Sequence, residues 1–137
     1  MEYDYLKIAG KPAIVTGGGR GIGRATALAL GRFGEKVMIC DVHDDWGESA
    51  VKEIRDHGGV AEYRHCDVAD PEQVKALVAA TVEVFGDVDI LVNNAGIGSV
   101  SLPFEEITDE DWDRMLRVDL TAPFYLCREV IPYMKAR

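Results

Sequence analysis

The sequence predicts an α/β fold in which helices cover both faces of a doubly wound parallel sheet. Two observations carry this prediction. Strand-like and helix-like segments alternate from one end of the chain to the other, and a glycine-rich turn separates the first such pair. Strand–helix units of this length imply right-handed crossovers and therefore parallel strands. The 137 residues, 47% of them apolar and 28% charged, are typical of one globular domain with a buried core.

The first strand and the first helix flank the glycine-rich turn. Residues 13–15 form a short apolar run that ends at glycines, as expected for a strand buried on both faces. In the helix that follows, apolar residues recur every three or four positions. We expect these residues to form its buried face: Ile22, Ala25, Ala29 and Phe33. Gly34 is expected to end this helix.

The next segments repeat the strand–helix pattern. A second strand is predicted over residues 37–40. A helix over roughly residues 45–57 follows, with Val51 and Ile54 pointing inward. A third strand is expected over residues 60–66, after two glycines that end the helix.

The third helix has a clear beginning and end. Asp70 and Pro71 start it, because the carboxylate caps the helix and the proline occupies a position whose N–H would have no partner. Gly86 is expected to stop it. Its buried face is expected to contain Val74, Leu77, Val78, Thr81 and Phe85. A fourth strand is predicted over residues 90–92.

The last part of the chain predicts a loop and one long helix. The loop covers residues 93–103, and the helix starts at Thr108, with Asp111 three positions later as in a capping box. Pro123 and Pro132 are each expected to kink this helix. Its apolar residues are spread over wide flanks: Trp112, Met115, Leu116, Leu120, Phe124 and Leu126.

Charge and composition exclude several classes of function. The net charge of −9 argues against nucleic acid as a partner, because phosphate binding needs a surplus of lysine and arginine. No signal peptide opens the chain and no stretch approaches the roughly 18 apolar residues of a membrane span. We therefore expect a cytoplasmic protein without membrane contact. No metal site is predicted, and three widely spaced cysteines are interpreted as free thiols: Cys40, Cys66 and Cys127.

The glycine-rich turn at residues 16–23, Thr-Gly-Gly-Gly-Arg-Gly-Ile-Gly, is the strongest motif in the chain. Gly17, Gly21 and Gly23 stand between a strand and a helix, where a side chain would block a pyrophosphate from approaching the backbone. The helix N-terminus supplies aligned N–H donors for such an anion. A P-loop is excluded, because Arg-Ala follows the last glycine in place of lysine and serine or threonine. The turn therefore predicts a dinucleotide site.

Asp41, at the end of the second strand, predicts which dinucleotide is bound. In a Rossmann-type half-sheet, an acid at this point accepts hydrogen bonds from the adenosine ribose hydroxyls and repels a 2′-phosphate. Val42 and His43 provide no permanent cation for that phosphate, which favours NAD. Arg20, in the glycine-rich turn, would favour NADP instead, and NADP remains the alternative cofactor.

The chain resembles the short-chain dehydrogenase/reductase family through three motifs in order: Thr16-Gly17-x3-Gly21-x-Gly23, Asp67-Val68 and Asn93-Asn94-Ala95-Gly96. The resemblance implies a four-stranded Rossmann-type sheet in the order third, second, first, fourth. It also implies that Asp67 contacts the adenine amino group beside the Val68 backbone, and that Asn93, Ala95 and Gly96 line the cofactor cleft. The residues expected to bind cofactor are Thr16, Gly17, Gly19, Arg20, Gly21, Ile22, Gly23, Asp41, Asp67, Val68, Asn93, Ala95 and Gly96.

The resemblance further implies NAD-dependent hydride transfer to or from an alcohol or carbonyl carbon. Where the family places an asparagine in the long helix, this chain has Asp119, the candidate catalytic residue, which lacks the amide donor. The family's catalytic serine, tyrosine and lysine belong after a fifth strand. Tyr3 and Lys7 have the tyrosine–lysine spacing but precede the first strand. We therefore expect residues 1–137 to be a partial dinucleotide-binding domain, truncated before the fifth strand and inactive alone.

Two alternatives to an oxidoreductase half remain open. One is a non-catalytic module that binds NAD or NADP, and the other is half of a split enzyme that a separate chain completes. Either way, we expect homo-oligomers or a partner chain. The fourth strand, at residues 90–92, is a short apolar edge, and the long final helix carries more apolar residues than one packed face accepts.

Overall fold

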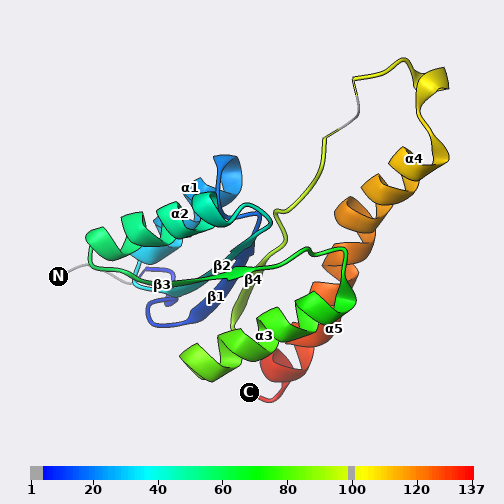
Figure 1. Ribbon diagram of the computed structural model, residues 1–137. Helices are drawn as coiled ribbons and strands as arrows, with labels where there is room; N and C mark the ends of the chain where they lie inside the picture. The colour runs from blue at the N-terminus through cyan, green and yellow to red at the C-terminus, as the bar shows by residue number, and fades with distance from the viewer. Residues whose placement is uncertain (1–4, 99–100) are drawn as a thin grey trace.

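The computed structural model describes residues 5–98 and 101–137 and shows a sheet covered by helices on both faces (Figure 1). Its four parallel strands lie in the order β3-β2-β1-β4, which confirms the predicted fold class and strand order. The first elements are β1 (Pro12–Thr16), α1 (Gly21–Arg32), β2 (Lys36–Asp41), α2 (Asp44–Asp56), β3 (Val60–His65) and α3 (Pro71–Phe85). They are followed by β4 (Ile90–Val92), the 3₁₀ helix η1 (Phe104–Glu106), α4 (Asp109–Leu116), the π-helical segment η2 (Arg117–Thr121) and α5 (Ala122–Lys135).

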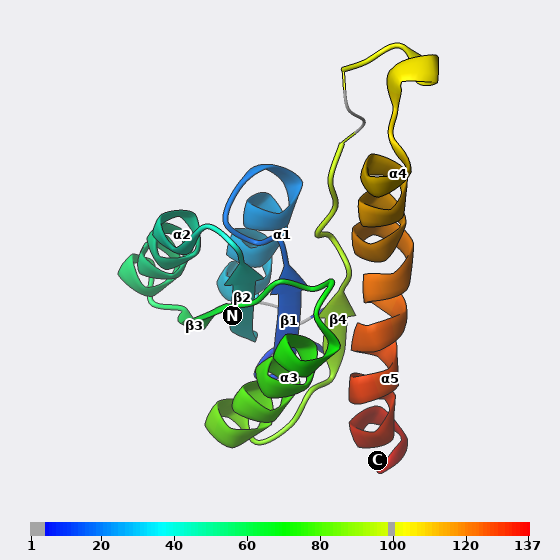
Figure 2. The same cartoon turned by 45° about the vertical axis from the view of Figure 1, so that its right-hand side comes forward.

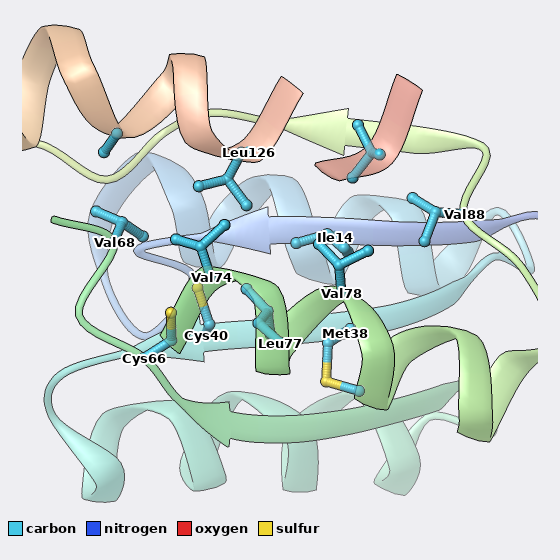
Figure 3. Close-up of a cluster of buried hydrophobic side chains, with 12 residues drawn as sticks. Ile14, Met38, Cys40, Cys66, Val68, Val74, Leu77, Val78, Val88 and Leu126 are labelled. Atoms are coloured by element: carbon cyan, nitrogen blue, oxygen red, sulfur yellow. The ribbon is translucent and has the colours of Figure 1, made fainter. Parts of the chain in front are cut away.

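The sheet separates two apolar clusters, because successive strand residues point to opposite faces. Helices α1 and α2 cover one face, where Val15 and Ile39 are buried against the predicted inward residues Val51 and Ile54. Helices α3 and α5 cover the other face (Figure 2), where Ile14 and its neighbours are buried. Figure 3 shows this second cluster, which includes Met38, Cys40, Cys66, Val74, Leu77, Val78 and Leu126. The predicted face of α3 is thus confirmed, with Thr81 buried and Phe85 half-buried.

The predicted buried face of α1 is wrong. The four residues expected on it are exposed: Ile22, Ala25, Ala29 and Phe33. The buried positions are Gly23, Ala27 and Gly31, spaced four residues apart. A Cβ added to Gly31 would lie 2.7 Å from Ile54 Cγ2 of α2. Helix α1 therefore approaches its neighbours through its smallest residues, while Leu28 and Leu30 pack against the edge of the apolar cluster.

The helix ends follow the predicted capping residues. Asp70 accepts a hydrogen bond from the backbone N–H of Glu72 at 3.0 Å, and α3 stops at Gly86, whose φ is +89°. At the start of α4, Thr108 and Asp111 form a capping box in which each side chain binds the other residue's backbone N–H. Each such cap stabilises a helix by about 1 kcal/mol.

The predicted long final helix is not one regular α-helix. Its middle, the segment η2, is π-helical and separates α4 from α5. Pro123 lies in the first turn of α5. A proline lacks the N–H that would bond four residues back, and its ring displaces that carbonyl, which here belongs to Asp119 within η2. The break thus coincides with one of the two predicted kinks, whereas Pro132 lies inside α5.

Much of the apolar surface of this helical arm, α4 to α5, lies in the open. Leu126 is buried, but six large apolar side chains of the arm are exposed: Trp112, Leu116, Leu120, Phe124, Ile131 and Tyr133. Strand β4 pairs with β1 on one side only, in a register that places Ile14 opposite Leu91, and so forms one edge of the sheet. None of the helices in the described part of the chain combines the length and apolar character that crossing a bilayer requires.

Candidate functional site

A cleft of about 820 Å³ opens where the parallel strands end. This volume lies within the range of about 300–1,000 Å³ that is usual for ligand sites, and the carboxyl ends of parallel strands are where open α/β sheets bind ligands. Nine of the predicted cofactor-binding residues line the cleft: Gly17, Arg20, Gly21, Ile22, Asp41, Asp67, Val68, Ala95 and Gly96. The structure therefore brings together residues that are up to 79 positions apart in the chain.

The glycine-rich turn forms one wall of the cleft. Gly17 and Gly21 have φ values of +61° and +58°, in the left-handed region that favours glycine. A Cβ on Gly23 would lie 2.2 Å from the carbonyl oxygen of Gly17, so no other residue fits there without movement. The first turn of α1 has no acidic residue, and its N-cap, Arg20, provides no side-chain acceptor. Its leading N–H groups are therefore available to an anionic ligand.

Thr16 and Asn94 hold the ends of β1 and β4 together behind this wall. The hydroxyl of Thr16, which is 2% exposed, accepts hydrogen bonds from the N–H groups of Asn94 and Ala95, each at 3.0 Å. The Asn94 amide donates back to the carbonyl oxygens of Thr16 and Gly17 at 3.0 and 3.1 Å. Thr16 thus lies behind the lining rather than in it. The sequence analysis missed Asn94, whose partners lie 77 and 78 positions away.

Asp41 is the acid of the cleft, and its carboxylate is fixed by backbone donors. Gly19 donates its N–H to Oδ2 at 3.0 Å, and His43 donates its N–H to Oδ1 at 3.0 Å. Asp41 is only 8% exposed, yet it lines the cleft. Each carboxylate oxygen retains acceptor capacity for a ligand hydroxyl. Gly19 therefore acts on the site through Asp41 and does not itself line the cleft.

Three side chains that converge beside Asp41 were not recognised together from the sequence. The rings of His43 and Trp46 are stacked, with centroids 3.9 Å apart. The guanidinium of Arg20 lies over the Trp46 ring, 4.6 Å from its centroid. All three line the cleft. The only signal for Trp46 in the sequence is its position in the first turn of α2, directly after the strand that ends at Asp41.

Outside the cleft, the Asp44 carboxylate contacts two side chains of β3. The Tyr63 hydroxyl donates to Asp44 Oδ1 at 2.5 Å and lies 3.0 Å from the carbonyl oxygen of Asp41, and His65 Nδ1 lies 2.8 Å from the same carboxylate oxygen. The hydrogen bond from Tyr63, followed by that from His65, lowers the pKa of Asp44 below its usual value. These hydrogen bonds join β3 to the start of α2, and none of Asp44, Tyr63 and His65 lines the cleft.

Asp67 and Val68 form the wall of the cleft that follows β3. The Asp67 side chain accepts a hydrogen bond from the N–H of Ala69 at 3.0 Å, which shapes the turn, and Val68 is 6% exposed. On the opposite side, Arg114 and Arg117 also line the cleft, from α4 and η2. Sequence analysis missed these two arginines, because the path of the final helix past the strand ends is set by tertiary packing.

Three other predicted site residues lie outside the lining. Gly23 is buried beneath the turn. The Asn93 side chain points to α5, where its amide donates to Cys127 Sγ at 3.7 Å. Asp119 accepts a hydrogen bond from the N–H of Ile97 at 2.8 Å, and so joins η2 to the segment after β4. Tyr3 lies outside the described residues, and so do positions 99 and 100 of the predicted loop.

The three cysteines are free thiols, as predicted. Cys40 and Cys66 are buried side by side beneath the cleft, each directly before an acid that lines it (Figure 3). The hydrogen bond with Cys66, together with burial, raises the pKa of Cys40 well above its usual value. Within the part of the chain that the structure describes, no group of histidine, cysteine and acidic residues could hold a metal ion.

Comparisons with known proteins agree with this geometry. The sequence model of the family described as "short chain dehydrogenase" matches residues 11–137. An uncharacterized oxidoreductase of Thermotoga maritima is 43% identical over 120 residues, which are 88% of this chain and 46% of that protein. The chain spans about half the length of the curated relatives it matches.

Two solved structures of similar fold carry different nicotinamide cofactors. A metagenomic short-chain oxidoreductase in complex with NADP superimposes with a TM-score of 0.89 at 35% identity, over 94% of this chain and 58% of that one. A 7α-hydroxysteroid dehydrogenase complexed with NADH and 7-oxo glycochenodeoxycholic acid gives 0.92 at 34% identity, over 99% and 52%. The fold therefore accommodates either dinucleotide.

Proposed function

Because this chain belongs to the short-chain dehydrogenase family, we propose that it supplies the cofactor-binding part of an NAD-dependent oxidoreductase. The observation that supports this function best is the cleft itself, which joins a glycine-rich turn at a helix N-terminus to a fixed carboxylate. The first feature suits a pyrophosphate, and the second suits a ribose diol. When bound, the nicotinamide would accept or release a hydride at the carbon of an alcohol or carbonyl substrate.

The residues present are suited to hold such a dinucleotide in one orientation. The N–H groups at the start of α1 would hold the pyrophosphate, beside Gly17 and Gly21, which have no side chains of their own. Asp41 would hold the adenosine ribose, and Asp67 and Val68 would hold the adenine. Asp119, at the family's asparagine position, is proposed to orient the segment after β4 through its bond to Ile97.

The preference for NAD is proposed from the charge of Asp41. A 2′-phosphate adds about 1.5–2 negative charges. Two unit charges of like sign 4 Å apart repel by about 4 kcal/mol near a protein surface, so NADP would be disfavoured at a fixed carboxylate. Arg20 lines the cleft and directly follows Gly19, whose N–H binds Asp41, so it is the cation placed to offset this repulsion, and its guanidinium lies over Trp46.

Titration of the 137-residue chain with NAD and NADP by calorimetry tests this proposal. We expect NAD to bind more tightly, and Asp41→Ala to reduce the ratio of the two affinities about tenfold or more, equivalent to ~1.4 kcal/mol. Asp45→Ala, which removes a neighbouring acid that does not line the cleft, is the matched control. Equal or tighter binding of NADP by the unmodified chain would contradict the preference for NAD. Binding of neither cofactor would contradict the function.

We propose in addition that these 137 residues bind the cofactor without turning over alcohols or ketones. After β4, Tyr125 is followed four positions later by glutamate and Tyr133 by arginine, so no tyrosine there has the lysine that the family uses. Without a tyrosine of lowered pKa, the site lacks an evident acid or base for the reaction. An absorbance assay of reduced nicotinamide checks this. Turnover that persists in Tyr3→Phe, after contaminants are excluded, would show catalytic groups elsewhere.

A non-catalytic binding module and a split enzyme stay as alternatives. Both predict cofactor binding without turnover, and only the second predicts that a separate chain carrying the other half restores turnover. We also propose that the chain self-associates or takes up such a partner through the helical arm and the β4 edge. Exposed apolar side chains such as Leu120, which is 67% exposed, support this proposal. The cytoplasmic location remains a prediction.

A further inference from the structure

The Arg20 guanidinium does not pair with Asp41, although Arg20 directly follows the glycine whose N–H binds that carboxylate. Its neighbour Gly19 donates its N–H to Asp41, so the backbone at this point is in direct contact with the carboxylate. Yet no described acid, Asp41 included, lies within ion-pair distance of the Arg20 guanidinium. The group lies over the Trp46 ring instead, 4.6 Å from the ring centroid.

The position of Trp46 is itself determined by close packing. A Cβ on Gly19 would lie 2.8 Å from both Trp46 Cβ and Asp41 Oδ2, so the turn, the acid and the tryptophan meet at one point. The other neighbour of Trp46 is His43, whose ring is stacked on it at 3.9 Å with an interplanar angle of 20°. The tryptophan is half-buried and has little freedom to leave the guanidinium.

We propose that Trp46 determines cofactor specificity as a positioning residue, by keeping the Arg20 guanidinium on its ring and so withholding it from a 2′-phosphate. This inference rests on the proposed function, because it concerns which dinucleotide the cleft accepts. Asp41 repels the 2′-phosphate. Trp46 holds the Arg20 guanidinium, whose positive charge would otherwise offset that repulsion. The preference for NAD thus has two sources, one of which is an aromatic side chain that carries no charge.

At the end of the cleft that holds Asp41, Arg20 is the cation on which affinity for a 2′-phosphate depends. The only other permanent cations among the described lining residues, Arg114 and Arg117, come from α4 and η2 rather than from the segments that contact Asp41. A guanidinium stacked on a partly exposed tryptophan is favoured by a small free energy, which corresponds to about a two- to fivefold bias. Release of Arg20 should therefore change affinity for NADP by a similar factor.

The test compares the ratio of the NAD and NADP affinities in variants of the 137-residue chain, measured by calorimetry. Trp46→Leu should shift this ratio toward NADP about two- to fivefold. The shift should disappear in the double variant with Arg20→Gln, because the released cation is then missing. Trp46→Phe, which keeps an aromatic ring, should shift the ratio less than Trp46→Leu.

Two further variants keep the test decisive. Trp112→Leu removes the only other tryptophan, which is exposed on α4 and does not line the cleft, and should leave the ratio unchanged. In this background Trp46 is the single tryptophan, so its fluorescence reports whether a cofactor reaches this end of the cleft. If Trp46→Leu fails to fold, Arg20→Lys replaces it. Lysine keeps the charge but lacks the planar group that stacks, and should shift the ratio in the same direction.

The outcomes separate this inference from the proposed function. Binding of NAD or NADP with a ratio that Trp46→Leu and Arg20→Lys leave unchanged overturns the inference and leaves the function standing. A shift toward NAD in Trp46→Leu overturns it as well, because the tryptophan would then present the cation to the phosphate. A shift toward NADP that persists in the double variant with Arg20→Gln also overturns the inference, because the loss of the tryptophan's bulk would then explain the shift without the cation. Absence of binding by the unmodified chain removes both proposals.

Discussion

The two faces of the sheet are completed to different degrees. On the α1–α2 face, helices approach so closely that glycines form the contacts, and the Cβ of any larger residue at Gly31 would overlap Ile54. On the other face, the helical arm buries Leu126 and Val130 but leaves large apolar side chains such as Leu120 and Phe124 in solvent. Helices α1 and α2 thus complete their face of the sheet by themselves, while the arm leaves an apolar surface in solvent, which we propose meets other protein.

The largest expected effect distinguishes two leucines of the same arm. Leu126→Ala should lower the free energy of unfolding by about 2–5 kcal/mol, because it leaves a cavity in the core beneath α3. Leu120→Ala, at a position 67% exposed, should change that free energy by less than about 0.5 kcal/mol in the monomer. Urea unfolding at low protein concentration measures both changes. Equal losses of unfolding free energy in the two variants would contradict the burial of Leu126 and the exposure of Leu120.

Leu120→Ala is also informative about association. If the exposed arm forms an interface, the variant should sediment as smaller species than the unmodified chain at micromolar concentration, although its stability is unchanged. A single, monodisperse monomer for the unmodified chain, unfolding cooperatively, would contradict the proposal that the arm meets other protein.

A smaller effect is expected on the closely packed face. Gly23→Ala should destabilise the fold by about 1–3 kcal/mol, because the added Cβ would lie 2.2 Å from the Gly17 carbonyl oxygen and 2.3 Å from the Asn94 amide nitrogen. It should also weaken NAD binding, since the turn must move. Gly98→Ala, where no described atom beyond the chain neighbours lies within 4 Å of the new Cβ, is the matched control. If Gly23→Ala left the midpoint of unfolding and the affinity for NAD unchanged, the turn would be more loosely packed than its contacts indicate.

The smallest effect concerns pH. The hydrogen bond from Tyr63 lowers the pKa of Asp44 in the folded state, so its stabilising contribution is present above the unfolded pKa of about 3.9 and is lost as pH falls through the folded value. Asp44→Asn should therefore be less stable than the unmodified chain at neutral pH, and the difference should shrink in acid. Asp45→Asn, in the same first turn of α2, controls for the helix dipole. A pH-independent difference would contradict the assignment.

Local rules predicted most of the fold and the outline of the cleft. The strands, the caps at Asp70 and Thr108, and the glycine-rich turn each depend on neighbours within a few residues, which a single sequence displays. The face of α1 was mispredicted because periodicity of apolar residues was counted, whereas close helix packing selects glycine and alanine. Asn94 and Trp46 were missed for another reason. Asn94 stands in a recognised motif and Trp46 follows the strand that ends at Asp41, but the partners of both are brought near only by tertiary structure.

The π-helical segment η2 sets the rotational phase between the two parts of the arm. A π-helical turn holds one more residue than an α-helical turn, and one residue corresponds to about 100° of rotation. Because η2 takes up this extra residue within one turn, the face of α4 that carries Arg114 toward the cleft stays in phase with the buried face of α5. A regular α-helix of the same residues would rotate that face by about 100°. Deletion of a single residue within Arg117–Thr121 would therefore leave an α-helical turn of the same rotation, and α4 would keep its face toward the cleft while α5 kept its place in the core.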